Sequence, residues 1–236
     1  MAKHLVELRP DLSLNDEDDN AIFVAHCPER VLPGKIMEEM ENNDRLIGGL
    51  TPKGAELARQ LYSTFCTADL LVTDAITAEM AKLTENSFRD VNIAFANELS
   101  VICDRLGIDV WELIELANHH PRVNILQPGP GVGGHCIAVD PWFIVSAAPD
   151  EARLIKTARD VNDGKPEWVM KQVLRALEGK EKPVVSALGI TFKNDIDDLR
   201  ESPSLEIVKR LSVENPHLDI RVVEPNVKKL PPVLSN

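Results

Sequence analysis

The chain has 236 residues, 44% of them hydrophobic, which is enough to bury a core in one or two domains. Its 26 lysines and arginines are outnumbered by 38 aspartates and glutamates, so the formal net charge is −12. An acidic surface repels phosphate, which argues against nucleic acid or an anionic membrane as the main partner. Because the sequence shows no apolar signal core, no membrane-spanning run and no CxxC pair, we expect a cytoplasmic protein whose four cysteines are reduced.

The first third of the chain predicts short elements separated by loops. Residues 1–12 predict a helix, residues 12–20 an acidic exposed loop, and the apolar run AIFVAH (21–26) a buried strand. A loop over 27–35 and a strand or turn at RLIGGL (45–50) follow. Thr51-Pro52 is typical of a helix start, and helical apolar spacing continues to residue 65.

The middle of the chain predicts one very long helix. Residues 74–106 contain neither glycine nor proline, Asp74 can cap the N-terminus, and Gly107 can close the C-terminus. Such a helix would be roughly 50 Å long and could not bury itself in a small domain, so we expect a spine between domains or subunits. A second helix is expected over 109–120.

The remainder predicts a structured loop and then a β-α-β unit. Residues 121–141 are rich in glycine and proline, and residues 151–179 predict two helices broken near Gly164–Pro166. A strand at 183–192, a helix at 202–214 and a strand at 220–225 favour a parallel, doubly wound sheet.

A GxGxxG pattern occurs at 129–134, directly before His135 and Cys136. A dinucleotide-binding loop would need a strand before it and a helix after it, whereas Pro128 and Pro130 precede it and Asp140-Pro141 is expected to cut off the helix. Two other interpretations remain open: a tight turn that uses glycine for positive φ, or a ribbon that wraps a ligand and presents a nucleophilic Cys136.

Several motifs in order resemble the UDP-glucose/GDP-mannose dehydrogenase family, and best of all its branch acting on UDP-N-acetylhexosamines. The resemblance covers about residues 22–226 and rests on six segments: CPERVLPGK (27–35), TAEMAKLTENSFRDVNIAFANEL (77–99), HPRVNIL (120–126), GPGVGGHCIAVDPWF (129–143), ARDVNDGKP (158–166) and GITFKNDIDDLRESPSLEI (189–207). It implies an α/β fold in three parts: the remnant of a Rossmann-type NAD-binding domain (1–72), a central helical dimerisation domain with one long helix (73–180), and the start of a second Rossmann-like, UDP-binding domain (181–236).

The resemblance also implies the reaction, an NAD-dependent four-electron oxidation at C6 of UDP-N-acetyl-D-mannosamine to the uronate, for surface polysaccharide synthesis. Cys136 would form a thiohemiacetal and then a thioester, and Glu29 would act as the base for its hydrolysis. Lys82 and Asn86, one helical turn apart, would stabilise the oxyanion, and Asp140 would assist proton removal. From the residues alone, Lys82 could equally be a solvated cation, Asp140 a turn cap and Glu29 a surface carboxylate.

The remaining matched positions would bind ligands. Gly131, Gly133 and Gly134 would line the sugar site, Arg122 would reach the sugar from a partner subunit of a homodimer, Phe192 and Lys193 would bind UDP, and Arg200 would lie near the NAD cofactor. Outside the resemblance, Lys193 and Arg200 would be ordinary exposed cations. The UDP-sugar and a second copy of the chain are thus the expected partners.

Other possibilities stay open. Nothing before residue 21 resembles the family's βαβ units and their GxGxxG loop, and the last domain stops early, so we expect a fragment that is inactive alone. The substrate could instead be UDP-glucose or UDP-N-acetylglucosamine, or the chain could be a non-catalytic dimerising module. A metal site at the pairs His26-Cys27, His119-His120 and His135-Cys136 is disfavoured, since their spacing matches no zinc pattern.

Overall fold

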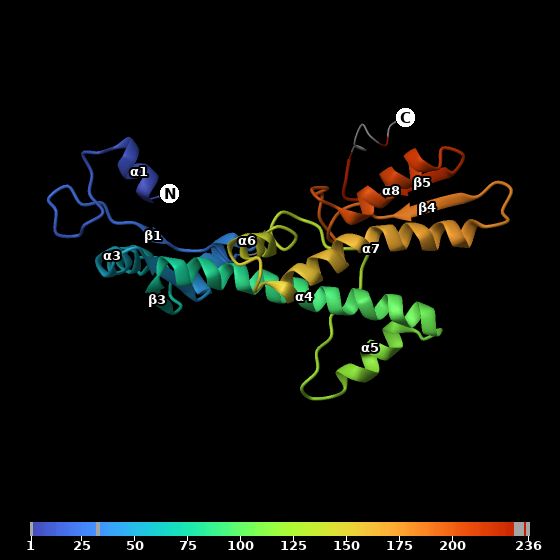
Figure 1. The fold of residues 1–236 in the computed structure, drawn as a ribbon, viewed down its shortest axis with the longest axis horizontal. Helices are drawn as coiled ribbons and strands as arrows, with labels where there is room; N and C mark the ends of the chain where they lie inside the picture. Colours follow the sequence, from blue (N-terminus) through green and yellow to red (C-terminus); the bar gives the residue numbers. More distant parts are fainter. Residues whose placement is uncertain (1, 32–33, 229–233, 235–236) are drawn as a thin grey trace. The chain divides into compact units, whose positions relative to one another are not determined.

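A computed structural model describes residues 2–31, 34–228 and 234, and the chain divides into two compact units with the boundary between Thr84 and Glu85 (Figure 1). Both units combine helices with sheet, which confirms the predicted α/β class. No helix in the described part of the chain is long and apolar enough to cross a membrane.

The first unit contains a three-stranded sheet in the order β1-β2-β3. Strands β2 (Arg45–Gly49) and β3 (Leu70–Asp74) are parallel, and β1 (Ala25–His26) pairs antiparallel with β2. Helix α3 (Pro52–Tyr62) is the crossover between the parallel strands, and α1 (Ala2–Leu8) and α2 (Ile36–Asn42) precede β2. The Thr51 side chain accepts a hydrogen bond from Gly54 N at 3.1 Å and caps α3, as the Thr-Pro start predicted.

The predicted strand over residues 21–26 is wrong for most of its length. Only Ala25 and His26 pair with β2, opposite Gly49 and Gly48. The antiparallel register places residues 21–24 beyond the end of β2, where the chain already turns into α3. Val24 O still accepts from Leu50 N at 2.8 Å, and Ala21 forms an isolated bridge with Ser13 instead of extending the strand. Phe23 is 38% exposed and packs on the Lys53 ammonium instead.

The long helix is confirmed. Helix α4 (Ala75–Leu106) has 32 residues and runs from the first unit into the second. Asp74 caps its start, since one carboxylate oxygen accepts from Thr77 N at 2.9 Å, and Gly107 follows its end with φ of +70°. Helix α5 (Val110–Asn118) is capped by Asp109 in the same way.

Two expectations about the next helices are wrong. Residues 153–177 form one helix, α7 (Arg153–Leu177), with Pro166 inside it, rather than two helices. Buried residues lie on both sides of the proline, among them Asn162 and Met170, and this continuous packing outweighs the loss of one helical hydrogen bond. Helix α6 (Asp140–Ala147) begins at Asp140-Pro141, which starts a helix instead of cutting one off, because proline fits the first turn.

The end of the second unit is the predicted β-α-β arrangement. Strands β4 (Val184–Leu188) and β5 (Asp219–Val223) are parallel and in register from Val184–Asp219 to Leu188–Val223. Helix α8 (Pro203–Glu214) connects them and packs against α7 (Figure 1). Met170 of α7 with Ile207 and Leu211 of α8 forms the hydrophobic core there.

Candidate functional site

The loop between α5 and α6 presents the thiol of Cys136. This side chain is exposed, and its residue lies one turn before α6, because Val139 N and Asp140 N donate to the Cys136 carbonyl oxygen at 3.0 and 2.8 Å. Cys66 and Cys103 are buried by contrast, and Cys27 is half-buried. An electrophile in solution can therefore reach Cys136 most directly.

A hydrogen bond brings two of the predicted catalytic side chains together beside this loop. Asn86 Nδ2, on α4, donates to Asp140 Oδ2, on α6, at 2.5 Å. Since the N–H of Asp140 is bonded to the Cys136 carbonyl, the amide, the carboxylate and the cysteine backbone form one connected group. An amide donor beside a carboxylate acceptor can hold a water or a hydroxyl group.

The three loop glycines predicted to line the sugar site, Gly131, Gly133 and Gly134, are closely packed against protein. Gly131 has φ of +144°, and a Cβ there would lie 3.3 Å from the Asn162 carbonyl oxygen. A Cβ on Gly133 would collide with the Glu201 carbonyl oxygen, and one on Gly134 would lie 3.0 Å from the Phe192 ring. These faces are filled and no strand precedes them, so the pattern does not fit a dinucleotide pyrophosphate.

Arg200, predicted to lie near the cofactor, is placed close to the cysteine. Its guanidinium donates to Asp198 at 3.0 and 2.6 Å. The ion pair raises the pKa of Arg200, to which the nearby Cys136 also contributes, and lowers the pKa of Asp198 to about 2. Lys193 and Arg122 are exposed, so both are free to meet a ligand from solvent.

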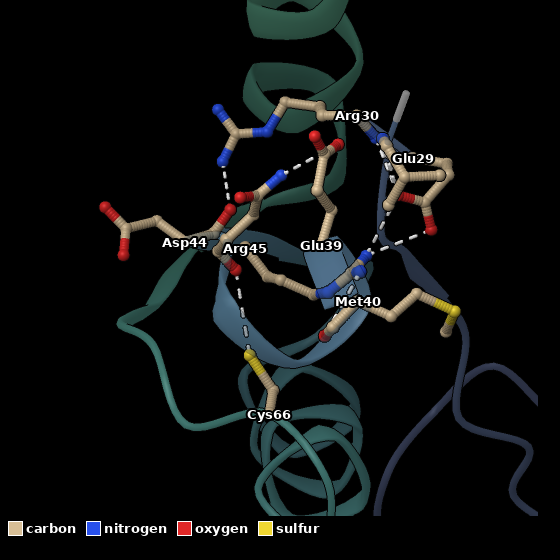
Figure 2. A network of polar contacts seen from close by, with 9 residues as sticks. Glu29, Arg30, Glu39, Met40, Asp44, Arg45 and Cys66 are labelled. Carbon is tan, nitrogen blue, oxygen red and sulfur yellow. Dashed lines mark hydrogen bonds and ion pairs between the residues drawn. The ribbon is translucent and has the colours of Figure 1, made fainter. Parts of the chain in front are cut away.

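Glu29 is held in the first unit by a buried arginine (Figure 2). Arg45 is 4% exposed, and its Nη1 donates to both carboxylate oxygens of Glu29 at 3.2 and 3.0 Å. Burial raises the pKa of Glu29, but the N–H of Arg30 and the guanidinium of Arg45 together lower it by more. Lys82 also belongs to this unit, on α4, whereas Cys136, Asn86 and Asp140 belong to the other.

A cavity of about 820 Å³ adjoins the cysteine loop in the second unit. Its lining includes His135 and Trp142 from the loop and α6, Arg159 from α7, and Glu201 and Lys209 from the segment around α8. Among the described residues, no group of three or more His, Cys, Asp or Glu side chains is arranged to hold a metal ion.

Sequence reasoning missed a buried polar cluster between α4 and α7. Asp90 and Asn97 on α4 are fully buried, and Arg159 and Asn162 on α7 are each 1% exposed. The only signal was spacing: Asp90 and Asn97 are seven apart and Arg159 and Asn162 three apart, so each pair shares one helix face.

Comparison with protein families matches this chain to three models in sequence order. Residues 2–66 match the NAD-binding domain, residues 76–164 the central domain and residues 186–234 the UDP-binding domain of the UDP-glucose/GDP-mannose dehydrogenase family. The exact domain boundaries predicted above remain a prediction.

Similar proteins point the same way. The UDP-N-acetyl-D-mannosamine dehydrogenase of Campylobacter jejuni is 59% identical over all of this chain and 58% of its own length. The NDP-N-acetyl-D-galactosaminuronic acid dehydrogenase of Ralstonia nicotianae is 60% identical over 96% of this chain and 54% of its own length. A solved structure of the Staphylococcus aureus UDP-N-acetyl-mannosamine dehydrogenase has a TM-score of 0.84 at 44% identity, covering 97% of this chain and 53% of that one. The chain thus spans about half the length of these relatives.

Proposed function

Because the chain belongs to the UDP-glucose/GDP-mannose dehydrogenase family, we propose that it serves the NAD-dependent four-electron oxidation of C6 of a UDP-N-acetylhexosamine. The observation that carries the proposal is the exposed Cys136, whose backbone is bonded to Asp140 while Asp140 is bonded to Asn86. UDP-N-acetyl-D-mannosamine is the favoured substrate, because several relatives that are 55–59% identical are named as dehydrogenases of that sugar, and the product would be the uronate used for surface polysaccharides.

The chain's own residues would act on the C6 aldehyde. The Cys136 sulfur forms a bond to C6 and the carbonyl oxygen takes up a proton, which gives a thiohemiacetal; oxidation then leaves a thioester, and water breaks the C–S bond to release the carboxylate and the thiol. NAD, when bound, accepts the hydrides. Asn86 and Asp140 would hold the oxygen at C6 and its proton, and Lys82 would stabilise negative charge there.

Glu29 would be a weak base in the hydrolysis step. Its lowered pKa keeps it ionised at neutral pH, so it can accept a proton, but the same shift reduces its basicity. The ion pair with Arg45 also fixes where the carboxylate points. We assign it an orienting role toward the attacking water as well as proton acceptance.

Neither the GxGxxG segment nor the end of β2 fits the pyrophosphate of the dinucleotide. The single GxGxxG pattern is packed against protein, as described above, and the end of β2 is closed, since a Cβ on Gly48 would collide with Ala78 and one on Gly49 with the Thr51 carbonyl oxygen. We therefore propose that the 236-residue chain alone does not reduce NAD. No step of the mechanism above is assigned to residues that bind it.

The chain would act as a homodimer through α4. A 4-3-4-3-4 spacing runs along this helix in the second unit and defines a seam of six residues: Phe88, Asn92, Phe95, Leu99, Ile102 and Leu106. Phe88, Phe95 and Leu106 are 70%, 54% and 64% exposed, so the seam faces solvent in the isolated chain. Apolar residues at this spacing are typical of helices that pair with another helix.

The addition step can be tested without NAD. Purified chain is treated with the 6-aldehyde of UDP-N-acetylmannosamine and then briefly with iodoacetamide, and the alkylated cysteines are quantified by mass spectrometry. We expect the aldehyde to protect Cys136, while the 6-hydroxyl sugar protects it less and Cys27, which is not in the loop, keeps its labelling. Equal labelling of Cys136 with and without aldehyde would contradict the assignment of the nucleophile.

The proposal that the chain alone does not reduce NAD is tested by NADH absorbance, with NAD and UDP-N-acetylmannosamine added to the purified chain. We expect no signal from the chain alone. A signal that disappears in Cys136→Ala would overturn the inactivity of the 236 residues while supporting the chemistry.

A further inference from the structure

A chain of side-chain hydrogen bonds connects the buried faces of α4 and α7 to the loop between α5 and α6, seven residues before Cys136. Gly129 N donates to Asn97 Oδ1 at 2.8 Å, and Asn97 Nδ2 donates to Asn162 Oδ1 at 2.8 Å. Asn162 Nδ2 in turn donates to the Asp90 carboxylate at 2.9 Å and to its carbonyl at 3.1 Å. We call Asn97, Asn162 and Asp90 the amide relay.

The direction of the relay is fixed by its two ends. A backbone N–H can only donate, so Asn97 must turn its oxygen to Gly129 and its nitrogen to Asn162. Asn162 must then turn its oxygen to Asn97 and its nitrogen to Asp90, which as a carboxylate can only accept. Arg159 Nη1, at 2.6 Å from Asp90 Oδ1, supplies the positive charge that lets this carboxylate stay buried.

The relay contacts the loop at Gly129, where the neighbouring residues provide no backbone N–H donor. Pro128 and Pro130 have no N–H, so Gly129 carries the single backbone donor of the three residues, and the relay takes it. A second member of the relay, Asn162, lies against the loop at Gly131. Pro166 cannot donate to the Asn162 carbonyl oxygen, and Gly131 packs close to this oxygen.

We propose that Asn97 and Asn162 are positioning residues, which anchor the loop at Gly129 and Gly131 and so set the place of Cys136. The inference deepens the proposed function and rests on it for the importance of Cys136. The anchoring itself needs no substrate, so it can be tested even if the chain is no enzyme.

The primary readout is hydrogen exchange of the Gly129 amide in the full chain, followed by NMR, with the rate of Cys136 alkylation as a second. In Asn97→Asp both side-chain oxygens accept, so one faces Asn162 Oδ1 and the relay cannot be completed. Gly129 N keeps an acceptor at residue 97, but the hydrogen bond from residue 97 to Asn162 that holds this acceptor in place is lost. We expect Gly129 exchange about tenfold faster, as for the loss of that one buried hydrogen bond, and a changed Cys136 alkylation rate. The matched control is Asn42→Asp on α2, which makes the same chemical change at an exposed residue of the other unit.

A rescue separates positioning from general damage. In the double variant Asp90→Asn with Asn97→Asp, the negative charge moves to residue 97, and the side-chain hydrogen bonds from 97 to 162 and from 162 to 90 can both reverse. Gly129 N keeps an acceptor at residue 97, Arg159 keeps its ion pair with Asp163, and the bond from Asn162 to the carbonyl of residue 90 is given up. We expect Gly129 exchange to return toward the wild-type rate, with the amides of β4 and β5 unchanged throughout as a measure of folding. A double variant that exchanges as fast as Asn97→Asp, or a single variant with wild-type exchange, overturns the inference. If Asn97→Asp does not fold, Asn97→Ser, too short to reach both partners, gives the same two outcomes.

Discussion

Arg45 and Asp90 show how single charged residues organise both units. Each is at most 4% exposed and each is held by an opposite charge, Glu29 at 3.0 Å in one unit and Arg159 at 2.6 Å in the other. The two pairs differ in burial, because Glu29 is half exposed while Arg159 is not. Removing Arg45 thus leaves its partner in water, whereas removing Asp90 would leave the buried guanidinium of Arg159 with Asp163 as its carboxylate partner.

We expect Arg45→Met to lower the free energy of unfolding of the first unit by about 1–3 kcal/mol, for the lost charged hydrogen bonds to Glu29. The pKa of Glu29 is lowered in the folded state, so the pair stabilises above the unfolded pKa near 4.5 and loses this effect as pH falls through the folded pKa. The difference in unfolding free energy between wild type and Arg45→Met should accordingly become smaller below about pH 4.5. Urea unfolding, monitored by hydrogen exchange of the β2 amides at several pH values, measures the unfolding free energy of the first unit.

The control for that variant is Arg59→Met. Arg59 forms an ion pair with Glu56 at 2.8 Å, but both side chains are more than 40% exposed. Surface pairs contribute about 0–1 kcal/mol, so the change in unfolding free energy should be small. Equal losses for the two arginine variants would mean that the burial of Arg45 adds nothing.

These buried charges could not have been found from the sequence. Arg159 lies 69 residues from Asp90, and the sequence around either residue does not indicate that the two form an ion pair. Cys136 could be predicted as a candidate nucleophile because the Gly-Gly-His-Cys motif around it is contiguous in the sequence. Side chains whose role depends on a distant partner need the fold before they can be recognised.

At the scale of elements, local signals predicted helices well and isolated strands poorly. The absence of glycine and proline gave α4 to within one residue, because nothing in that segment competes with the helix. The helix break predicted at Pro166 is wrong, because α7 is held together on both sides of the proline by tertiary packing, which the local sequence does not show. The strand predicted over residues 21–24 is wrong because tertiary pairing is missing there: these residues are apolar, but β2 ends before it reaches them.

The contact between α7 and α4 predicts a pH-dependent stability. Lys165 is 5% exposed, donates to the Asn97 carbonyl oxygen at 3.3 Å and to Ser100, and lies over the Trp168 ring. Burial lowers its pKa from 10.5 to about 8. Folding therefore disfavours the ammonium by at most about 3 kcal/mol. This penalty is complete below pH 8 and disappears as pH rises toward 10.5, so stability should rise with pH in that window.

Lys165→Met removes this titration. We expect the variant to be more stable than wild type at pH 7, and its advantage to shrink steadily between about pH 8 and 10.5. Tryptophan fluorescence during urea unfolding is a suitable measure, because all three tryptophans lie in the second unit. Lys171→Met, on the same helix with its side chain 69% exposed, is the control and should show no such trend. A constant difference across the window would refute the assignment to Lys165.

At the scale of the whole molecule, the resemblance of six separated motifs identified the family, which the three family matches then confirmed. Composition and periodicity alone could not have done so, because they constrain fold class rather than chemistry. The long helix adds a consequence of its own. A helix with a buried polar face and a second, solvent-exposed apolar seam has packing surface left over, and a second copy of the chain can cover it.

Phe95→Glu is expected to separate the proposed dimer. The phenyl ring is 54% exposed at the middle of the seam, and a carboxylate there would have to be buried without a partner in the assembled state. Light scattering after size exclusion should give twice the 26.2 kDa chain mass for wild type and the single mass for the variant. Glu98→Lys, at another exposed residue of α4 that is not one of the six seam residues, should remain dimeric. A wild-type chain that is monomeric at tens of micromolar, or a Phe95→Glu chain that stays dimeric, would show that the pairing surface is elsewhere or absent.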